Sequence, residues 1–596
     1  MNDMMRVGQA ASREGASAGM ARREVLKLLG GLGVGSAVFG RAVVALAQEK
    51  RSVTPETIQQ AEWISGLTFT DEQRKVMAQG VNRTLKQYAA LRKIEIDNGI
   101  FPANVFRPEP FASPGPAMPR GQIGLTEQAA APRPTSDEDL AFAPVRELAP
   151  LLRTRQVSSV ELTRLYLKRL GELDPTLHCV ITLTEELALR QAKRADREIA
   201  LGRYRGPLHG VPWGAKDLIA YPGYPTTWGA KPYEKQVRKE KASVAARLDE
   251  AGAVLVGKLA VGALAMGDVW FGETCRNPWK PSQGSSGSSA GPASATVAGL
   301  VGFAIGTETL GSIVSPCTRC GATGLRPTFG RVSRYGCMAL SWSMDKIGAI
   351  ARSVEDCALV FHAIHGADGL DPAAVDRPFH WPPLRDVRTL RVGYVESLFN
   401  ETPPATQPNE DGQERARQNE QRKFDRRTLE TLRQLGLKLI PIKLPQSYPL
   451  VPLLNILDAE AATAFDELTR SGRADLLVRQ GPDAWPNIFR QGELIPAVEY
   501  IRAGRIRSML MREMKEMMSQ VDVYVAPSFG GGNLLLTNLT GHPAVVLPNG
   551  FRAADGTPTS ITFTGRLYGE SDLLAVAHAY QQATEFHLRR PSLSRA

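Results

Sequence analysis

The sequence predicts an α/β protein in which helices and buried strands alternate along one large domain. Residues 160–170 and 185–201 repeat their apolar positions at the 3.6-residue period of a helix. The short apolar run at residues 254–258 is typical of a buried strand. With 596 residues, 43% of them hydrophobic and 22% charged, the chain has enough apolar material for a large core.

Residues 1–47 are typical of an export signal. Arg22 and Arg23 precede an apolar segment, and the sequence ALA at residues 45–47 has the small-residue pattern of a cleavage site. The segment resembles a twin-arginine-type signal peptide, so we expect a periplasmic or secreted protein without a membrane span after cleavage. An uncleaved membrane anchor is the alternative.

Two further segments precede the main domain. Residues 48–105 predict a helical extension, because Thr54 and Thr70 are each followed by helix-start residues and apolar residues then recur at helical spacing. Residues 106–138 are rich in proline and predict an extended linker. The main domain is expected to span residues 139–590. Within it, the polar residues 401–423 predict a surface insertion, followed by a helix from Phe424.

The net charge of +11 does not indicate a nucleic-acid-binding protein. Loss of residues 1–47 removes six basic and three acidic residues and leaves a charge of +8. The remaining Lys and Arg residues are dispersed and are not interleaved with aromatic residues, so they predict a solvated surface.

Two serine clusters lie in glycine-rich turns between residues 287 and 316. The first reads GSSAG from Gly287 and includes Ser288, and the second reads GTETLGS from Gly306 and ends at Ser312. Glycine-rich turns let successive backbone N–H groups point into one concavity, which can hold an anionic oxygen. Ser312 is therefore a candidate nucleophile.

A serine nucleophile needs a base that removes its proton. No histidine is close to Ser312 in sequence, although one of the eight histidines remains open as a partner in space. Lys216 ends an apolar run in GPLHGVPWGAKDL. A lysine packed there loses solvation, which favours its neutral form and lets it accept a proton. We interpret the adjacent Asp217 as a structural hydrogen-bond acceptor.

These motifs, with GATGLRPTFGRVSRYG and SWSMDKIGAIARSVEDCA, resemble the amidase signature family of serine hydrolases. The resemblance implies a mixed β-sheet core sandwiched by α-helices. It also implies a Ser-Ser-Lys triad, with Ser312 as nucleophile, Ser288 as a bridging serine after a cis peptide bond, and Lys216 as base. The separations of 24 residues between the two serines and 72 between Ser288 and Lys216 are similar to those of the family, whereas Ser285 would be three residues out of register.

The resemblance assigns the oxyanion hole to the backbone N–H groups of the turn that ends at the nucleophile: Thr309, Leu310, Gly311 and Ser312. Many family members read DTGGSIR here, and this chain reads ETLGSIV. Leu310 thus replaces a glycine, which we expect to narrow the pocket, and Val314 replaces an arginine, which removes a charge.

The function implied by the resemblance is hydrolysis of a carboxylic amide to acid and amine by an exported amidohydrolase. The reaction proceeds through a seryl acyl-enzyme without metal or cofactor, and the same acyl-enzyme permits an esterase side activity. A small-molecule amide is the expected partner, and a homodimer is left open. Two alternatives are the amidase subunit of a tRNA-dependent amidotransferase, which the export signal disfavours, and a non-catalytic binding protein, which the intact triad disfavours.

Several other residues have two interpretations. Cys317 and Cys320 form a C-x-x-C pair, but no second close pair completes a zinc site, so buried thiols or a disulfide between them are expected. We interpret His542 as structural. Trp342 and Met344 are assigned either to the pocket or to the core. The family signature fades in residues 445–515, which makes this segment a candidate for substrate selectivity.

Overall fold

The computed structural model describes residues 52–96, 102–104, 120–126, 132–400 and 412–593. The predicted export signal, residues 1–47, lies outside these ranges, as does much of the predicted linker at residues 106–138. In the described part of the chain, no helix is both long enough and apolar enough to cross a membrane.

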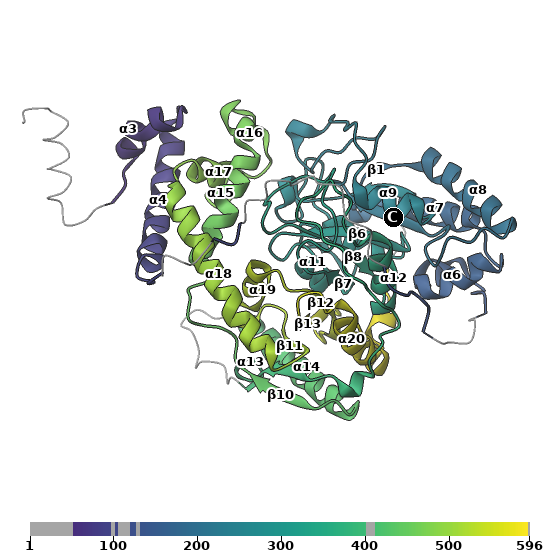
Figure 1. The fold of residues 1–596 in the computed structure, drawn as a ribbon. Coiled ribbons are helices and arrows are strands. Elements are labelled where there is room, and N and C mark those ends of the chain that lie inside the picture. The colour runs from purple at the N-terminus through teal and green to yellow at the C-terminus, as the bar shows by residue number, and fades with distance from the viewer. Residues whose placement is uncertain (1–51, 97–101, 105–119, 127–131, 401–411, 594–596) are drawn as a thin grey trace, which may run out of the picture.

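The two helices predicted in the N-terminal extension are present. They are α3 (Pro55–Ser65) and α4 (Asp71–Leu91), and Thr54 and Thr70 cap them by accepting hydrogen bonds from backbone N–H groups of the first turn. We call this extension, with residues 102–104, the N-terminal arm. Helix α4 packs against α17 (Trp485–Gly492), so the arm lies beside the helices of the segment that follows residue 450 (Figure 1).

One mixed sheet of 11 strands forms the centre of the molecule. This finding confirms the expected sheet class. Across the sheet, the strands are, in order, β1 (Val180–Leu183), β3 (Val254–Leu259), β2 (Pro212–Lys216), β6 (Phe303–Glu308), β8 (Lys346–Ala351), β7 (Thr323–Arg326), β12 (Ala544–Phe551), β13 (Pro558–Gly565), β11 (Val523–Pro527), β9 (Val392–Val395) and β10 (Leu439–Ile442). A separate two-stranded ribbon consists of β4 (Arg276–Asn277) and β5 (Lys280–Gly284).

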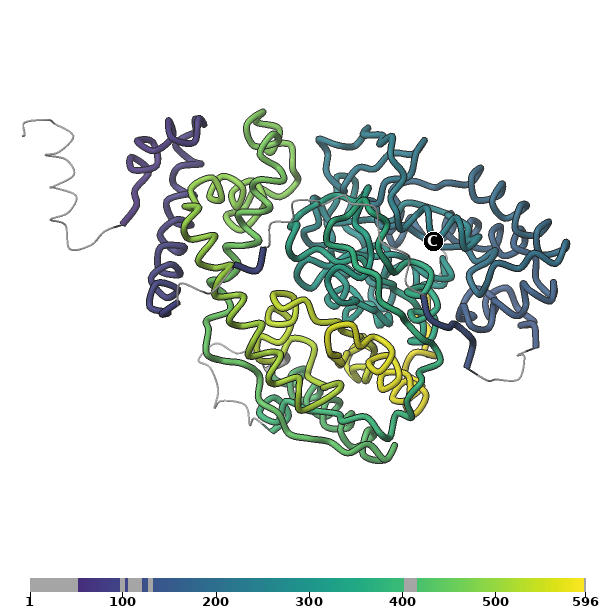
Figure 2. The backbone as a smooth tube through the Cα atoms, viewed as in Figure 1, coloured from purple at the N-terminus to yellow at the C-terminus, as the bar shows by residue number. Residues whose placement is uncertain are grey.

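Most of the remaining helices pack around this sheet. In chain order the remaining helices are α5 (Asp137–Phe142), α6 (Val145–Arg153), α7 (Ser159–Leu177), α8 (Glu185–Ala200), α9 (Ser243–Glu250), α10 (Ala290–Val297), α11 (Val314–Cys320), α12 (Val354–Ile364), α13 (Glu396–Asn400), α14 (Gly412–Gln434), α15 (Asn455–Ala464), α16 (Asp466–Arg470), α18 (Ala497–Ser519), α19 (Asn533–Thr540) and α20 (Glu570–Thr584). The helices of residues 455–519 pack mainly against one another and against α4 and α19. Helices α7 and α8 and strand β3 confirm the three elements predicted from periodicity. Figure 2 shows the purple N-terminal arm beside the green segment and far from the blue helices that begin the main domain.

The helix predicted from Phe424 begins earlier, at Gly412. Residues 412–423 of the predicted surface insertion are therefore helical, residues 401–411 lie outside the described ranges, and the insertion itself stays a prediction. Glu, Gln, Arg and Lys are good helix formers, so a polar composition does not distinguish a loop from a solvent-exposed helix.

The register of the sheet brings two distant motifs to one edge. Strands β2 and β6 are parallel neighbours, with Trp213 opposite Phe303 and Ala215 opposite Ile305. The carboxyl ends of parallel neighbours lie at the same edge of a sheet, where α/β proteins commonly place their ligands. Lys216, the last residue of β2, therefore lies beside the turn that follows β6.

Candidate active site

Lys216 is fully buried at the end of β2. Its Nζ donates hydrogen bonds to Ser288 Oγ at 2.8 Å and to Thr307 Oγ1 at 2.8 Å, and it lies 3.3 Å from the Thr307 carbonyl oxygen. Burial lowers the pKa of Lys216 to about 7, because the charged ammonium loses its solvation. A large share of this lysine is therefore neutral at neutral pH and able to accept a proton.

Ser288 lies just before α10, and the peptide bond that joins it to Gly287 is cis. A Cβ atom at Gly287 would lie 1.9 Å from the Gly267 carbonyl oxygen, so this close approach of two backbone segments requires a glycine. The Ser285 hydroxyl instead donates to the neighbouring Ser286 carbonyl. The structure thus places Ser288, and not Ser285, against Lys216.

Ser312 lies in the turn between β6 and α11 and is 7% exposed. Its carbonyl oxygen accepts a hydrogen bond from the Ser289 N–H at 3.0 Å. The Ser289 hydroxyl in turn donates to the Thr307 carbonyl and accepts from the Thr307 N–H. The two serine clusters, which are separate in sequence, are therefore joined directly beside Lys216. Sequence analysis missed Thr307, although it lies within the second cluster.

The backbone of this turn is open toward a ligand. Gly311 has a φ of +85°, a left-handed conformation that favours glycine. The N–H groups of Leu310, Gly311 and Ser312 have no acceptor among the described residues. The Thr309 hydroxyl donates to Asp345 Oδ1 at 2.5 Å, which fixes the start of the turn. Free N–H groups of this kind are the donors that an oxyanion needs, and the oxyanion hole in this turn stays a prediction.

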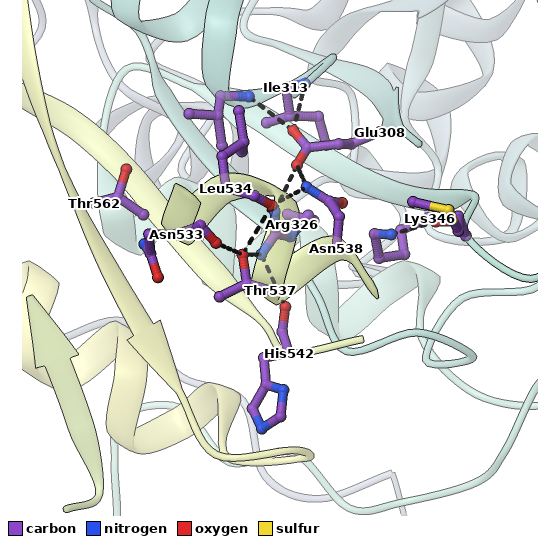
Figure 3. A network of polar contacts seen from close by, with 12 residues as sticks. Glu308, Ile313, Arg326, Lys346, Asn533, Leu534, Thr537, Asn538, His542 and Thr562 are labelled. Carbon is purple, nitrogen blue, oxygen red and sulfur yellow. Dashed lines mark hydrogen bonds and ion pairs between the residues drawn. The ribbon is translucent and has the colours of Figure 1, made fainter. Parts of the chain in front are cut away.

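A buried polar network centred on Glu308 supports the turn that bears Ser312 (Figure 3). Glu308 Oε2 accepts hydrogen bonds from the N–H groups of Ile313 and Val314, and its Oε1 accepts from Arg326 Nη1 at 2.6 Å and from Asn538 Nδ2. Burial raises the pKa of Glu308, but Arg326, the Val314 N–H and Asn538 together lower it, and the net result is a pKa of about 2. The Arg326 guanidinium thus places a positive charge beside Glu308. The turn keeps this charge although Val314 stands where many family members have an arginine.

The structure contains a cavity of about 850 Å³. Asp345, which holds Thr309, forms part of its wall, whereas Lys216, Ser288 and Ser312 do not. Asp345 thus links the cavity wall to the Thr309 hydroxyl, at the start of the turn that bears Ser312. Leu310 packs against the core and does not line this cavity, so its expected effect on the pocket at Ser312 stays a prediction.

The cavity wall shows which of Trp342 and Met344 lies in a pocket and which lies in the core. It also contains residues of segment 445–515, the candidate for substrate selectivity. Trp342 lines the cavity and is half-exposed, whereas Met344 is fully buried in the core. The segment 445–515 contributes four wall residues: Glu460, Tyr500, Arg507 and Met511. The position of this segment in the cavity wall favours a role in substrate selectivity, which stays a prediction.

All eight histidines lie in the described ranges, and no histidine ring forms a hydrogen bond with the triad. The His542 ring pairs with the Thr540 hydroxyl at 2.9 Å, and the His542 carbonyl accepts from Arg326. Burial lowers the pKa of His542 to about 3, so the ring stays neutral. These contacts agree with a structural role.

Cys317 and Cys320 are both free thiols, buried in α11. Burial raises the pKa of each, so both remain protonated. No group of three or more potential metal ligands occurs in the described part of the chain. Asp217 is buried, where it accepts from Lys258 Nζ at 2.6 Å and from Thr227, as a structural acceptor would.

Comparison with known proteins identifies the family. The amidase family model matches residues 161–534. A glutamyl-tRNA(Gln) amidotransferase subunit of Methylococcus capsulatus is 34% identical over 493 residues, which cover 75% of this chain and 98% of that protein. The protein of the same name from Chloroflexus aurantiacus is 35% identical over 486 residues, which cover 74% and 96%.

A solved structure supports the same family assignment. The native peptide amidase of Stenotrophomonas maltophilia superposes with a TM-score of 0.64 at 29% identity, over 75% of this chain and 98% of that one. The mixed sheet and its surrounding helices are thus those of a known fold. The chain belongs to the amidase signature family, and it is an amide C–N hydrolase.

Proposed function

We propose that this enzyme hydrolyses a carboxylic amide through an acyl-enzyme on Ser312, with Ser288 as the bridging serine and Lys216 as the base. The observation that carries the proposal is the 2.8 Å contact between the buried Lys216 Nζ and Ser288 Oγ, beside the turn that bears Ser312. A buried lysine with a pKa of about 7 is suited to exchange protons at neutral pH.

The first half-reaction forms the acyl-enzyme. Ser312 Oγ attacks the amide carbon, its proton passes to Ser288, and the Ser288 proton passes to neutral Lys216. The N–H groups of the 309–312 turn stabilise the negative charge that develops on the carbonyl oxygen. Loss of one such donor costs about 3–4 kcal/mol in comparable enzymes, so the shape of this turn is as important as the nucleophile.

The amine then leaves. The C–N bond breaks, and the proton held by Lys216 returns through Ser288 to the leaving nitrogen. In the second half-reaction, a water molecule attacks the ester carbon of the acyl-enzyme and gives up a proton along the same path. The acid is released and Ser312 regains its proton, so both halves use the same donors and the same base.

A second candidate is the amidase subunit of an amidotransferase. The relatives at 34% and 35% identity are both named as subunits of a glutamyl-tRNA(Gln) amidotransferase, and this similarity favours such a subunit over an exported amidohydrolase. The similarity to a peptide amidase supports hydrolysis of an amide substrate. We keep periplasmic export as a proposal that rests on residues 1–47 alone.

One experiment separates the two candidates. The full chain is purified and its release of amine is measured with glutamine and with peptide amides, alone and with amidotransferase partner subunits and glutamyl-tRNA, beside Ser312→Ala. Turnover of peptide amides by the chain alone supports the amidohydrolase. Glutamine turnover that requires the partners supports the amidotransferase role. Turnover that survives in Ser312→Ala contradicts the proposed mechanism.

Export is tested on the same chain in cells. We expect the wild-type protein in the periplasmic fraction and the double variant Arg22→Lys, Arg23→Lys in the cytoplasm, because a twin-arginine signal requires the arginine pair. The variant keeps the charge of the segment, so a general effect of charge is excluded. Equal amounts of both proteins in the cytoplasm would overturn the export proposal and favour the amidotransferase role.

A further inference from the structure

Lys216 Nζ has three polar neighbours, and two of them belong to one residue. They are Ser288 Oγ at 2.8 Å, Thr307 Oγ1 at 2.8 Å and the Thr307 carbonyl oxygen at 3.3 Å. Among the described residues this nitrogen has no other hydrogen-bond partner. The proton path described above uses only the contact with Ser288, so it gives the two contacts with Thr307 no role.

The protonation state of Lys216 decides in which direction these hydrogen bonds run. The charged ammonium has three N–H donors and no lone pair, so it donates to all three oxygens. The neutral amine has only two N–H donors, and its third position is a lone pair. In the neutral state, which the base needs, one of the three oxygens therefore faces the lone pair.

The identity of that oxygen follows from what each group is able to do. The Thr307 carbonyl has no proton and only accepts, so it takes one N–H of the amine. Ser288 has to give its proton to the amine when it receives the proton of Ser312, so its oxygen faces the lone pair in the reactive state. The second N–H is then left for Thr307 Oγ1.

Thr307 is itself held firmly at this place. It lies in β6, and its backbone carbonyl accepts from the Ser289 hydroxyl at 3.0 Å. Its backbone N–H donates to the same hydroxyl at 3.1 Å, and Ser289 is fully buried. Within the described part of the chain, Thr307 Oγ1 has no hydrogen-bond partner except Lys216. The Thr307 hydroxyl therefore serves the lysine alone.

We propose that Thr307 is a positioning residue for the base: its carbonyl and hydroxyl oxygens take both N–H groups of neutral Lys216 and direct the lone pair at Ser288. The inference rests on the proposed function, because it assumes that the Ser312 proton travels through Ser288. In the transfer, the Ser312 proton moves to Ser288 Oγ while the Ser288 proton moves to the lone pair. The ammonium that forms donates to the same three oxygens, so Thr307 also stabilises its charge.

Thr307→Val tests the role of the hydroxyl, because it replaces Oγ1 by a methyl group and keeps the β-branched shape that suits a strand. The rate at which an alkyl fluorophosphonate labels Ser312 is measured by intact mass from pH 5 to 9. Ser312 Oγ bonds to phosphorus, fluoride leaves, and the Ser312 proton passes through Ser288 to Lys216.

We expect two changes in Thr307→Val. The plateau rate at high pH should fall about tenfold or more, because a hydrogen bond to a charged group is lost and the lone pair is no longer directed. The midpoint of the pH profile, near pH 7 in the wild type, should move about one pH unit lower, since the ammonium loses an acceptor. Thr307→Ala, which removes the hydroxyl without adding bulk, should show the same two changes.

Two further variants separate positioning from a general loss of structure. Thr307→Ser keeps the hydroxyl and should restore both the rate and the midpoint. Thr296→Val should label as the wild type does, because the Thr296 hydroxyl is buried in α10 and has no partner among the described residues. A wild-type rate or an unchanged midpoint in Thr307→Val and Thr307→Ala overturns the inference. Labelling that persists in Ser312→Ala contradicts the proposed function instead.

Discussion

Lys216 Nζ lies 2.8 Å from Ser288 Oγ, and both side chains are buried. The contact joins the end of β2 to the start of α10, two elements that are 72 residues apart in sequence at these positions. An ordinary lysine is charged at neutral pH and donates in such a contact. Because burial lowers the pKa of this lysine to about 7, the direction of the hydrogen bond can reverse near neutral pH.

The first prediction is therefore a pH profile. Only neutral Lys216 accepts the proton that Ser288 relays, so kcat/KM should rise with pH and reach half its plateau near pH 7. Lys216→Met should lose at least about a hundredfold in kcat, since general-base catalysis contributes about 10²- to 10⁴-fold. The measurement is amide turnover from pH 5 to 9, with the exposed Lys231→Met as control. A flat profile would assign the base to another group.

The second prediction concerns the register of the first serine cluster. Ser288→Ala should reduce the rate of labelling by a fluorophosphonate at least about a hundredfold, because it breaks the proton path between Ser312 and Lys216. Ser285→Ala should change this rate less than about threefold, since the Ser285 hydroxyl donates to the neighbouring Ser286 carbonyl. Comparable losses in both variants would show that the cluster acts only by its shape.

The elements of this fold that sequence alone predicts are those with local causes. Thr54 and Thr70 cap their helices through residues one turn away, and α7 and α8 follow from apolar periodicity. The start of α14 at Gly412 was not predictable in this way, because its first turns have no apolar stripe.

The candidate site likewise contains residues that sequence motifs indicate and residues whose roles depend on contacts between distant segments. The resemblance supplied Lys216, Ser288 and Ser312, and the structure places the first two in contact and the third in the adjoining turn. Thr307 and Asp345 were not found, because their roles depend on which segments meet in space. Thr307 reaches Lys216 only through the β2–β6 register, and Asp345 reaches the turn from the loop before β8.

The third prediction concerns stability in acid. The pKa of Glu308 is depressed to about 2, whereas an unfolded glutamate titrates near 4.5. Between these values the unfolded chain binds more protons, so this carboxylate contributes stability above pH 4.5 that is lost as the pH falls toward 2. The contribution is about 3 kcal/mol at 1.36 kcal/mol per unit.

Chemical unfolding of wild type and Glu308→Gln between pH 3 and 7 measures this contribution. The free energy of unfolding of the variant should depend less steeply on pH between 3 and 4.5. Glu186→Gln, on the solvent side of α8, should keep the wild-type slope. Equal slopes in wild type and Glu308→Gln would mean that Arg326 does not stabilise the charged form.

The last prediction concerns the loop that carries Asp345. Glu460 Oε2 accepts from the Ser341 hydroxyl at 2.5 Å and from the Ser343 N–H at 3.0 Å. Asp345 Oδ2 accepts from the Ser341 N–H, and its Oδ1 accepts from Thr309. Glu460 is thus linked through the loop to the 309–312 turn, and we predict that it positions this turn.

Glu460→Gln should lower kcat about tenfold or more, because a lost hydrogen bond to a charged group costs about 1.5–3 kcal/mol. KM should change little, since the displaced turn matters most in the transition state. The exposed Glu467→Gln, on the neighbouring α16, is the matched control. Steady-state kinetics on a good amide substrate and the Tm of each variant separate the two roles of Glu460. A lower Tm with unchanged kcat would mean that Glu460 is a purely structural residue. A lower kcat in a variant that unfolds at the wild-type temperature would mean that Glu460 positions the 309–312 turn.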